Sequence, residues 1–330
     1  MKVKLGDVCE RGSSNLKQSD VVGMSGDYPI YGAAGYLGNV DFYHQEKPYV
    51  AVVKDGAGIG RTTLHPAKSS VIGTMQYLLP KSNILPEYLY YVVSYKHLEK
   101  YFTGATIPHI YFKDYKNEKF NLDSLDMQKK IVDILSKCEG IIKSRNKELE
   151  LLDELVKARF VEMFGDPVLN DKKFSTLSGE DFFKLSNGKA VPEEKRHEVG
   201  IPAYGGNGIS WYTNEVLRVE DTLVVGRVGF QSGNVHYAVG PLWITDNAMY
   251  ISQYDKGKIN LVFLCELMQR VNFSRFQDAG DLKKITQKPF MSFQYILPSM
   301  ELQQKFVDFK EQIDKSKVSL YYKNRKDGFP

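Results

Sequence analysis

The longest uninterrupted run of the sequence, Leu125 to Phe164, has the spacing of a single α-helix. Its apolar residues recur every three or four positions, with charged residues between them. No proline interrupts the run, and Gly165 and Pro167 follow its end as stop signals. The run therefore predicts one helix about 60 Å long, at 1.5 Å per residue. The apolar stripe is Ile131, Ile134, Leu135, Cys138, Ile141, Ile142, Leu149, Leu152, Leu155, Val156, Phe160 and Met163.

A helix this long with a narrow apolar face needs another element alongside it. A second run, from Met300 to about Tyr322, has the same spacing and is about half as long. We expect the two helices to form an antiparallel coiled coil that acts as a spacer. A parallel partner from another chain, or an ordinary amphipathic helix over a globular core, are the alternatives. The second stripe is Leu302, Phe306, Phe309, Ile313 and Leu320, with Lys317 on the seam.

The segments before each helix repeat one order of elements. Tyr204, in Ile201-Pro-Ala-Tyr-Gly-Gly-Asn-Gly208, lies 173 residues (204 − 31) after Tyr31, in Tyr28-Pro-Ile-Tyr-Gly-Ala-Ala-Gly35. A near-constant offset predicts one domain-plus-helix unit used twice. The offset is 173 from Gly56 and Gly60 to Gly229 and Gly233, and 175 from Leu122, Met127, Gln128 and Ile131 to Leu297, Leu302, Gln303 and Phe306.

Within each repeat, short β runs precede a helical pattern. Tyr49–Val53 and Thr74–Leu79 are the clearest strands of the first repeat, and Pro86–Tyr95 is helical with proline in its first turn. In the second repeat, Asp221–Gly226 is the counterpart of Tyr49–Val53, and Asn260–Met268 is the counterpart of the helical segment. The expected fold class is α+β, with two α/β domains related by a pseudo-twofold axis and separated by the two helices.

Composition is that of a soluble globular protein, with 42% hydrophobic and 25% charged residues and a net charge of +4. This charge permits nucleic-acid binding without demanding it. The three cysteines, Cys9, Cys138 and Cys265, are far apart, which indicates reduced core residues in a cytosolic protein. The sequence has neither a signal-peptide core nor a run of eighteen apolar residues, so we expect a cytoplasmic protein without a membrane segment.

Motifs for catalysis and metal binding are not found. The glycine-rich run Val52–Gly60 lacks the third glycine of a dinucleotide fingerprint and precedes a strand-like segment, which indicates a structural turn. The six histidines show no H-x-x-x-H spacing and no cysteine pair accompanies them, so no metal site is expected. No nucleophile elbow or Asp/Asn-Pro-Pro-aromatic tetrapeptide occurs. An enzyme acting on nucleic acids or glycans through an unrecognised acidic site is the weaker alternative.

The loops that recur in both repeats combine glycine or threonine with aromatic, amide and basic tips. Such groups suit phosphate contacts and hydrogen bonds to base edges in a major groove. A single residue of this kind is more often a solvated loop residue without a binding role. Because the residues recur in both repeats, however, a DNA-binding role is favoured for the set as a whole. The candidates are Tyr31, Tyr36, Lys54, Arg61, Thr106, His109 and Lys113 in the first repeat and Tyr204, Asn207, Trp211, Arg227, Gln231, Lys283, Lys284 and Gln287 in the second.

A family resemblance rests on the repeated turns and on the runs that border the helices. These runs are Lys4-Leu-Gly-Asp-Val8, Ile30-Tyr-Gly-Ala-Ala-Gly35, Ala203-Tyr-Gly-Gly-Asn-Gly208, Leu125-Asp-Met-Gln-Lys-Lys-Ile131, Gly280-Asp-Leu-Lys-Lys-Ile-Thr286, Met300-Glu-Leu-Gln-Gln-Lys-Phe306 and Ala158-Arg-Phe-Val-Glu-Met-Phe-Gly-Asp-Pro167. The last of them is the most specific. Over essentially its full length the chain resembles the specificity (S) subunit of type I DNA restriction-modification systems.

The resemblance implies target-recognition domains at 1–123 and 166–298 and helical spacers at 124–165 and 299–330. Each domain would read one half of a split duplex-DNA site, and the helices would set the gap and dock two modification (methyltransferase) subunits. Those partners would bring S-adenosylmethionine, and two restriction subunits, where present, would add cleavage that requires ATP and magnesium. The S subunit itself would carry no catalytic centre and no cofactor.

One departure from the family pattern is the short second spacer, which ends in Lys326-Asp-Gly-Phe-Pro330. It suggests a compact or truncated variant. The alternative function is therefore a scaffold, or a silent or phase-variable S variant, that does not assemble a full complex. The docking candidates on the helices are Ile131, Leu135, Cys138, Ile142, Leu149, Leu152, Phe160, Phe306, Phe309, Ile313 and Leu320.

Overall fold

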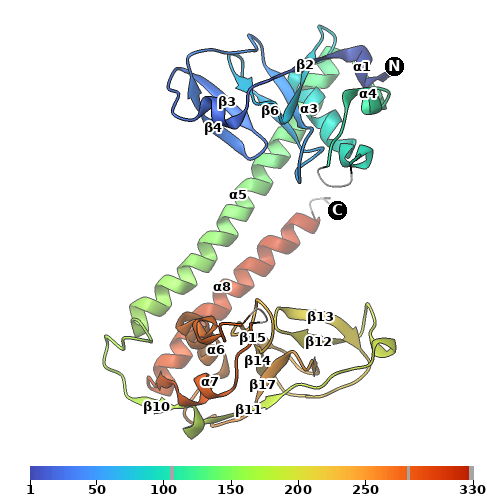
Figure 1. Cartoon of the computed structure of the whole chain (residues 1–330). Helices are drawn as coiled ribbons and strands as arrows, with labels where there is room; N and C mark the ends of the chain where they lie inside the picture. Colours follow the sequence, from blue (N-terminus) through green and yellow to red (C-terminus); the bar gives the residue numbers. More distant parts are fainter. Residues whose placement is uncertain (105–107, 281–282, 327–330) are drawn as a thin grey trace. The chain divides into compact units, whose positions relative to one another are not determined.

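A computed structural model describes residues 1–104, 108–280 and 283–326 (Figure 1). They form two compact units, Met1–Ser144 and Arg145–Pro330, and the boundary between the units falls within helix α5 (Leu125–Phe164). The finer division into two domains and two spacers stays a prediction. Thr106, one of the candidate residues, lies outside the described residues.

Unit 1 is built from short strands and helices. Its strands are β1 (Lys2–Lys4), β2 (Cys9–Ser13), β3 (Tyr28–Gly32), β4 (Gly35–Val40), β5 (Tyr49–Val53), β6 (Thr62–His65), β7 (Ser70–Val71), β8 (Met75–Pro80) and β9 (Lys119–Asn121). Its helices are α1 (Leu5–Val8), α2 (Gln18–Val21), α3 (Pro86–Tyr95), η1 (Leu98–Tyr101), α4 (Phe112–Tyr115) and the first half of α5. The strands form a sheet of order β2-β8-β5-β6, a sheet of order β4-β3-β7 and a β1-β9 ribbon.

Unit 2 repeats this plan. Its strands are β10 (Thr176–Ser178), β11 (Phe183–Asn187), β12 (Ile201–Gly205), β13 (Gly208–Thr213), β14 (Thr222–Gly226), β15 (Val235–Ala238), β16 (Trp243–Ile244), β17 (Ala248–Tyr254) and β18 (Gln294–Ile296). Its helices are η2 (Gly179–Asp181), η3 (Glu193–Lys195), α6 (Leu261–Val271), η4 (Phe273–Phe276), α7 (Lys288–Ser292) and α8 (Met300–Lys326), besides the end of α5. The sheets have the orders β11-β17-β14-β15, β13-β12-β16 and β10-β18.

The predicted repeat is confirmed down to the register of the strands. In both units the three-stranded sheet joins one antiparallel and one parallel pair. The antiparallel pair shifts register at the same place, between Ile30 and Tyr31 in β3 and between Ala203 and Tyr204 in β12. The tyrosines that define the offset of 173 therefore occupy equivalent bulged positions.

Strand β5 shows how each unit is layered. All five of its residues are buried, as expected for a central strand with both faces covered. Because side chains alternate along a strand, Val50 and Val52 pack in a cluster with α3, whereas Tyr49 and Ala51 pack on the side that includes β7. Each unit is thus a helix, a four-stranded sheet and a three-stranded sheet in layers, with β14 as the counterpart of β5.

The observed bounds of the two long helices, α5 and α8, agree with the predicted bounds at three of the four helix ends and differ at the fourth. Helix α5 begins at Leu125 and ends at Phe164, as predicted, and Gly165 follows with a φ of 71°. This left-handed conformation suits glycine and ends the helix. Helix α8 begins at Met300 but continues to Lys326, four residues beyond the predicted end. With 27 residues against 40, it is longer than the predicted half of α5.

In unit 2 the end of α5 packs against α8 and α6. The ring of Phe160 lies 5.5 Å from that of Phe306 and 5.8 Å from that of Phe263. About two turns earlier in α5, the carboxylate of Asp153 forms an ion pair with Lys317, later in α8, at 2.5 Å. Because the partner number in α8 falls as the number in α5 rises, the two helices are antiparallel here. The predicted antiparallel pairing is therefore confirmed for this part of α5. The predicted position of Lys317 at the contact between the two helices is confirmed as well.

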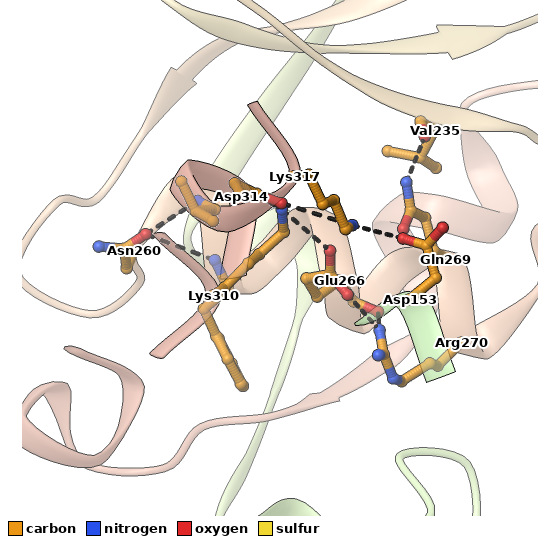
Figure 2. A network of polar contacts seen from close by, with 11 residues as sticks. Asp153, Val235, Asn260, Glu266, Gln269, Arg270, Lys310, Asp314 and Lys317 are labelled. Atoms are coloured by element: carbon orange, nitrogen blue, oxygen red, sulfur yellow. Dashed lines mark hydrogen bonds and ion pairs between the residues drawn. The ribbon is translucent and has the colours of Figure 1, made fainter. Parts of the chain in front are cut away.

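A polar network joins α5, α6 and α8 beside this aromatic core. Figure 2 shows Lys310 between Glu266 and Asp314, at 3.8 Å and 2.6 Å, and Arg270 bound to Glu266 at 2.6 Å. The Arg270 guanidinium also lies 4.1 Å from the ring centroid of Phe160. The charges thus alternate in sign across the three helices and complement the apolar packing.

The apolar stripe of α5 divides into a packed part and an exposed part. Phe160 is fully buried in unit 2, and Ile131 is half-buried against the core of unit 1. Leu135 and Ile142, in contrast, are 36% and 52% exposed. Of the other docking candidates, Leu149, Leu152, Phe309, Ile313 and Leu320 are half-buried and Phe306 is buried. No helix among the described residues is both long and apolar enough to cross a membrane.

The cysteines follow the prediction in two of three places. Cys9 and Cys265 are buried, and burial raises the pKa of each thiol to about 12. Cys138, however, is only partly buried on α5, so its assignment as a core residue was wrong. It lies about two turns beyond Ile131, which packs against the core of unit 1, and is itself not among the described residues of that core.

A buried glutamine near the start of each long helix fastens that helix to its own unit. Gln128 accepts from the Leu85 N–H at 2.9 Å and donates to the carbonyls of Asn83 and Asp123. In unit 2, the side chain of Gln303 makes the same three bonds, to the Asn260 N–H and to the carbonyls of Lys258 and Pro298. Both glutamines are 0% exposed. These two landmarks of the sequence repeat are therefore structural anchors.

We expect acid to destabilise unit 1 through His65, which is 5% exposed. Burial lowers the pKa of His65 to about 4, whereas an unfolded histidine has a pKa near 6.5. Between these values the unfolded chain binds the proton and the folded chain does not, so stability falls as pH falls. From pH 7.5 to pH 5 the loss attributable to this residue should be about 2 kcal/mol.

Urea unfolding at pH 7.5 and pH 5 measures this loss when wild type is compared with His65→Asn. The variant should lose about 2 kcal/mol less than wild type over the same interval. His97→Asn is the control, since the side chain of His97 is 74% exposed, and it should keep the wild-type pH dependence. Equal losses in all three proteins would contradict the assignment to His65.

Candidate nucleic-acid interface

In both units the glycine-rich hairpin and the loop before the long helix are joined by the same backbone hydrogen bonds. The Gly56 N–H donates to the carbonyl of Pro108, and the Ile110 N–H donates to the carbonyl of Lys54. The equivalent bonds in unit 2 run from Gly229 to Lys283 and from Ile285 to Arg227. Two of the predicted groups of loop residues, far apart in sequence, are therefore neighbours in each unit.

The hairpin tips also share their internal turns. The N–H of Gly60 bonds to Val53 O, and that of Gly233 bonds to Gly226 O, at 2.9 Å and 2.8 Å. Each bond on one tip has its counterpart 173 residues later, so the backbones match. The side chains on the matching backbone differ: Lys54, Asp55, Ala57, Gly58 and Arg61 in unit 1 correspond to Arg227, Val228, Phe230, Gln231 and Asn234 in unit 2.

In unit 1 two of the four basic candidates, Lys54 and His109, bind one carboxylate. Asp55 binds Lys54 Nζ at 2.5 Å and His109 Nδ1 at 2.7 Å. Lys113 lies with its Nζ 5.3 Å from the ring centroid of Tyr111, which is about half exposed. The structure thus brings Lys54 and His109 together through Asp55, an acidic residue that was not among the candidates.

The tyrosine-rich turn of unit 1 meets the same hairpin. The Arg61 guanidinium donates to the carbonyl of Ala33, in the turn between β3 and β4. Tyr36 is 62% exposed and its ring lies 5.9 Å from that of Tyr31. Tyr31 itself packs against the buried cluster around Tyr49, so Tyr36 is the member of the pair that is free to contact a ligand.

In unit 2 the candidates surround two adjoining cavities. A cavity of about 650 Å³ is lined by Asn207, Trp211 and Gln231, and one of about 500 Å³ by Arg227, Lys284 and Gln287. Val228 lines both cavities. Six of the eight candidates of the second repeat therefore lie on one continuous surface. Tyr204 packs instead against the cluster that contains Val224 and Ile244. Lys283 contributes its backbone carbonyl, which accepts a hydrogen bond from the Gly229 N–H.

Several residues at these cavities were not among the candidates. The Arg196 guanidinium lies 5.3 Å from the ring centroid of Trp211, and Phe230 is 88% exposed at the hairpin tip. Asn187 accepts a hydrogen bond from Gln287 at 3.4 Å. Phe230 could have been found from its place in the repeated hairpin. Arg196 has no counterpart among the repeat landmarks, and its approach to Trp211 depends on the tertiary fold.

The surface around the two cavities carries many hydrogen-bonding and aromatic groups. Its side chains are guanidinium, ammonium, amide and aromatic groups, which are the groups that contact phosphates and base edges in DNA complexes. Two acidic residues, Asp246 and Asp278, also line the cavities. Among residues 1–104, 108–280 and 283–326, no group of three His, Cys, Asp or Glu residues is placed to hold a metal ion.

Comparisons with known proteins agree with this description. A family model for the "Type I restriction modification DNA specificity domain" matches residues 1–151 and again residues 171–326. The putative type I restriction enzyme MjaX specificity subunit of Methanocaldococcus jannaschii is 26% identical over 314 residues, 79% of this chain and 73% of the relative. The MjaVIII specificity subunit of the same organism is 31% identical over 128 residues, 38% of this chain but only 30% of that relative.

Two solved structures share the fold. The S subunit of the type I restriction-modification system from M. genitalium has a TM-score of 0.68 at 17% identity, over 99% of this chain and 94% of that one. A chain from a study of complex assembly in a type I R-M system has a TM-score of 0.53 at 13% identity, over 99% and 93%. Since the family model covers most of the chain in two matches, this protein is a member of the type I restriction-modification DNA specificity family.

Proposed function

We propose that this chain is the DNA sequence-recognition subunit of a type I restriction-modification complex and that it reads a split site. The observation that carries the proposal is the pair of matching hairpin-and-loop frameworks with different side chains at their tips. One backbone framework would place each unit on a half-site in the same way. Different side chains at the tips would read different bases. Contacts to bases determine sequence specificity, whereas contacts to phosphates position the protein on the duplex.

The helices would carry the second part of the function. Leu135, Ile142 and Leu155, each at least 36% exposed on α5, offer apolar surface for docking two modification subunits. The length of the helical spacer would set the distance between half-sites, just as the distance between subunits sets the half-site spacing of dimeric DNA-binding proteins. The modification subunits would supply S-adenosylmethionine and the catalytic groups, and any restriction subunits would use ATP and magnesium. This chain would contribute recognition alone and act in the cytoplasm.

Methylome sequencing of cells with and without the gene tests the proposal. We expect a bipartite methylated motif that disappears when the gene is deleted and returns when it is restored. If modification subunits co-purify with the chain but no motif depends on it, sequence recognition is wrong. If no modification subunit co-purifies, the chain is instead a scaffold or a silent variant, an alternative suggested by α8 being shorter than α5.

Exchange of residues 1–123 for the corresponding domain of another family member should change one half of the motif and leave the other intact. The reason is that each unit has its own cores and its own hairpin framework. The methylated motif of cells that carry the exchanged gene is the measurement. A change in both halves would contradict the assignment of one unit to one half-site.

Substitution of Lys284 by alanine should weaken binding of the split site by about 1–3 kcal/mol if the residue makes a base contact, and by less for a phosphate contact. Lys284 is exposed at the second cavity and its backbone pairs with Val228. Binding to duplex DNA should be measured with the assembled complex over a range of salt, because affinity should fall steeply as salt rises. Lys256→Ala, on the loop after β17, is the matched control and should bind as wild type does.

A further inference from the structure

The tip of the hairpin between β14 and β15 presents one aromatic ring to solvent. Phe230 is 88% exposed, the highest value for any large apolar side chain among the described residues. Its counterpart in unit 1 is Ala57, on the same backbone turn. An exposed phenylalanine adds nothing to the core of unit 2, and this one lines a cavity beside Trp211 rather than standing alone on the surface.

The backbone beneath this ring is held in place. The Ser232 N–H donates to the carbonyl of Gly229 at 3.0 Å, and Gln277 donates to the carbonyls of Ser232 and Phe230 at 2.6 Å and 3.4 Å. Gly229 has a φ of 90°, a turn conformation that glycine adopts without strain. The ring is therefore carried on an ordered turn, which lowers the entropy lost when it contacts a ligand.

The surroundings of Phe230 are polar and rich in hydrogen-bonding groups. It lines the 650 Å³ cavity together with Asn207, Gln231 and Trp211, and Arg227 precedes it by three residues on the same hairpin. Amide and guanidinium tips bind the hydrogen-bonding edges of bases in the major groove. The one feature of that groove that is apolar is the C5-methyl group of thymine, and phenylalanine is among the side chains that contact it.

Resting on the proposed function, we infer that Phe230 reads a thymine methyl group in the half-site bound by unit 2. Unit 1 has the much shorter side chain of Ala57 at the equivalent place, which extends less far from the turn. The difference between the two tips thus becomes a difference between the two half-sites. Phe230 is a specificity-determining residue, and its neighbours on the hairpin supply the contacts to polar base edges.

The experiment uses the full chain assembled with its modification subunits and the split site found by methylome sequencing. Each thymine of the half-site bound by unit 2 is replaced in turn by deoxyuridine, which removes only the methyl group. At one position the affinity of the wild-type complex should fall about fourfold, the value of one buried methyl group. Phe230→Ala should weaken binding of the unmodified site about tenfold and abolish the effect of deoxyuridine at that position.

Two further variants complete the test. Phe230→Leu keeps an apolar tip and should retain part of the deoxyuridine effect. Val239→Ala is the matched control, because Val239 is 60% exposed just beyond the opposite end of β15, and it should behave as wild type. Deoxyuridine in the half-site bound by unit 1 should act equally on wild type and Phe230→Ala.

The outcomes separate this inference from the proposed function. If the wild-type complex binds the split site but Phe230→Ala binds equally well, or no thymine of that half-site responds, the inference is wrong and the function stands. The inference is also wrong if 2-aminopurine fluorescence shows that Phe230 unstacks a base step, because the ring would then be a wedge. If the wild-type complex binds no split site, the proposed function itself fails.

Discussion

Replacement of Gln303 by methionine should lower the free energy of unfolding of unit 2 by about 3 kcal/mol or more. Methionine has nearly the same shape but makes none of the three hydrogen bonds that Gln303 makes to Asn260, Lys258 and Pro298. Each backbone group left buried without a partner costs about 1–3 kcal/mol. Because Gln303 is 0% exposed, little water can reach these groups in its place.

Urea unfolding of the full chain measures this effect when a separate spectroscopic signal is recorded for each unit. Gln312→Met is the control, since Gln312 is an exposed residue of the same helix, and it should change stability by less than about 0.5 kcal/mol. Gln128→Met should destabilise unit 1 in the same way, since Gln128 makes the equivalent bonds. A Gln303→Met protein as stable as the control would show that the side chain is not an anchor.

Truncation of Phe160 to alanine should destabilise unit 2 by about 3–5 kcal/mol. The ring is 0% exposed and lies 4.9 Å from that of Phe164 and 5.5 Å from that of Phe306, so its removal leaves a cavity between α5, α6 and α8. It also removes the ring that faces the Arg270 guanidinium at 4.1 Å. That buried cation would then lose a favourable contact as well.

Thermal or urea unfolding gives the measurement, and Leu155→Ala supplies the comparison. Leu155 lies on the same helix but is 47% exposed, so its truncation should cost about 0.5 kcal/mol or less. The two variants differ in burial and share the helix, so they separate packing from helix propensity. Similar losses in both would mean that the end of α5 does not belong to the core of unit 2.

Local patterns were enough to predict the elements and their repetition. The bounds of α5 followed from apolar spacing and from Gly165, and α3 from Pro86, because both signals act within a few residues of one another. The offset of 173 paired Tyr31 with Tyr204, and the structure shows that both lie at equivalent bulges. The end of α8 was placed four residues early, at Tyr322, although Gly328 and Pro330 follow Lys326 in the sequence as stop signals.

The candidate surface was predicted in part. The sequence named the hairpins and the loops, and the structure joins them in both units. It did not name Asp55, which binds Lys54 and His109, because Asp55 and His109 are 54 residues apart and carry no periodic signal. Phe230 was missed for a different reason: only its place on the repeated hairpin distinguishes it in the sequence from a phenylalanine of the core.

The sequence by itself determined the two long helices, the clearest strands of each repeat, that the domain occurs twice, and which turns recur, because these depend on residues close together in the chain. Only the tertiary structure decided which recurring side chains meet, which glutamines are buried, and that Cys138 lies outside the cores. Those outcomes depend on contacts between residues tens of positions apart. Such contacts form when the whole unit closes around its core, so no local pattern encodes them.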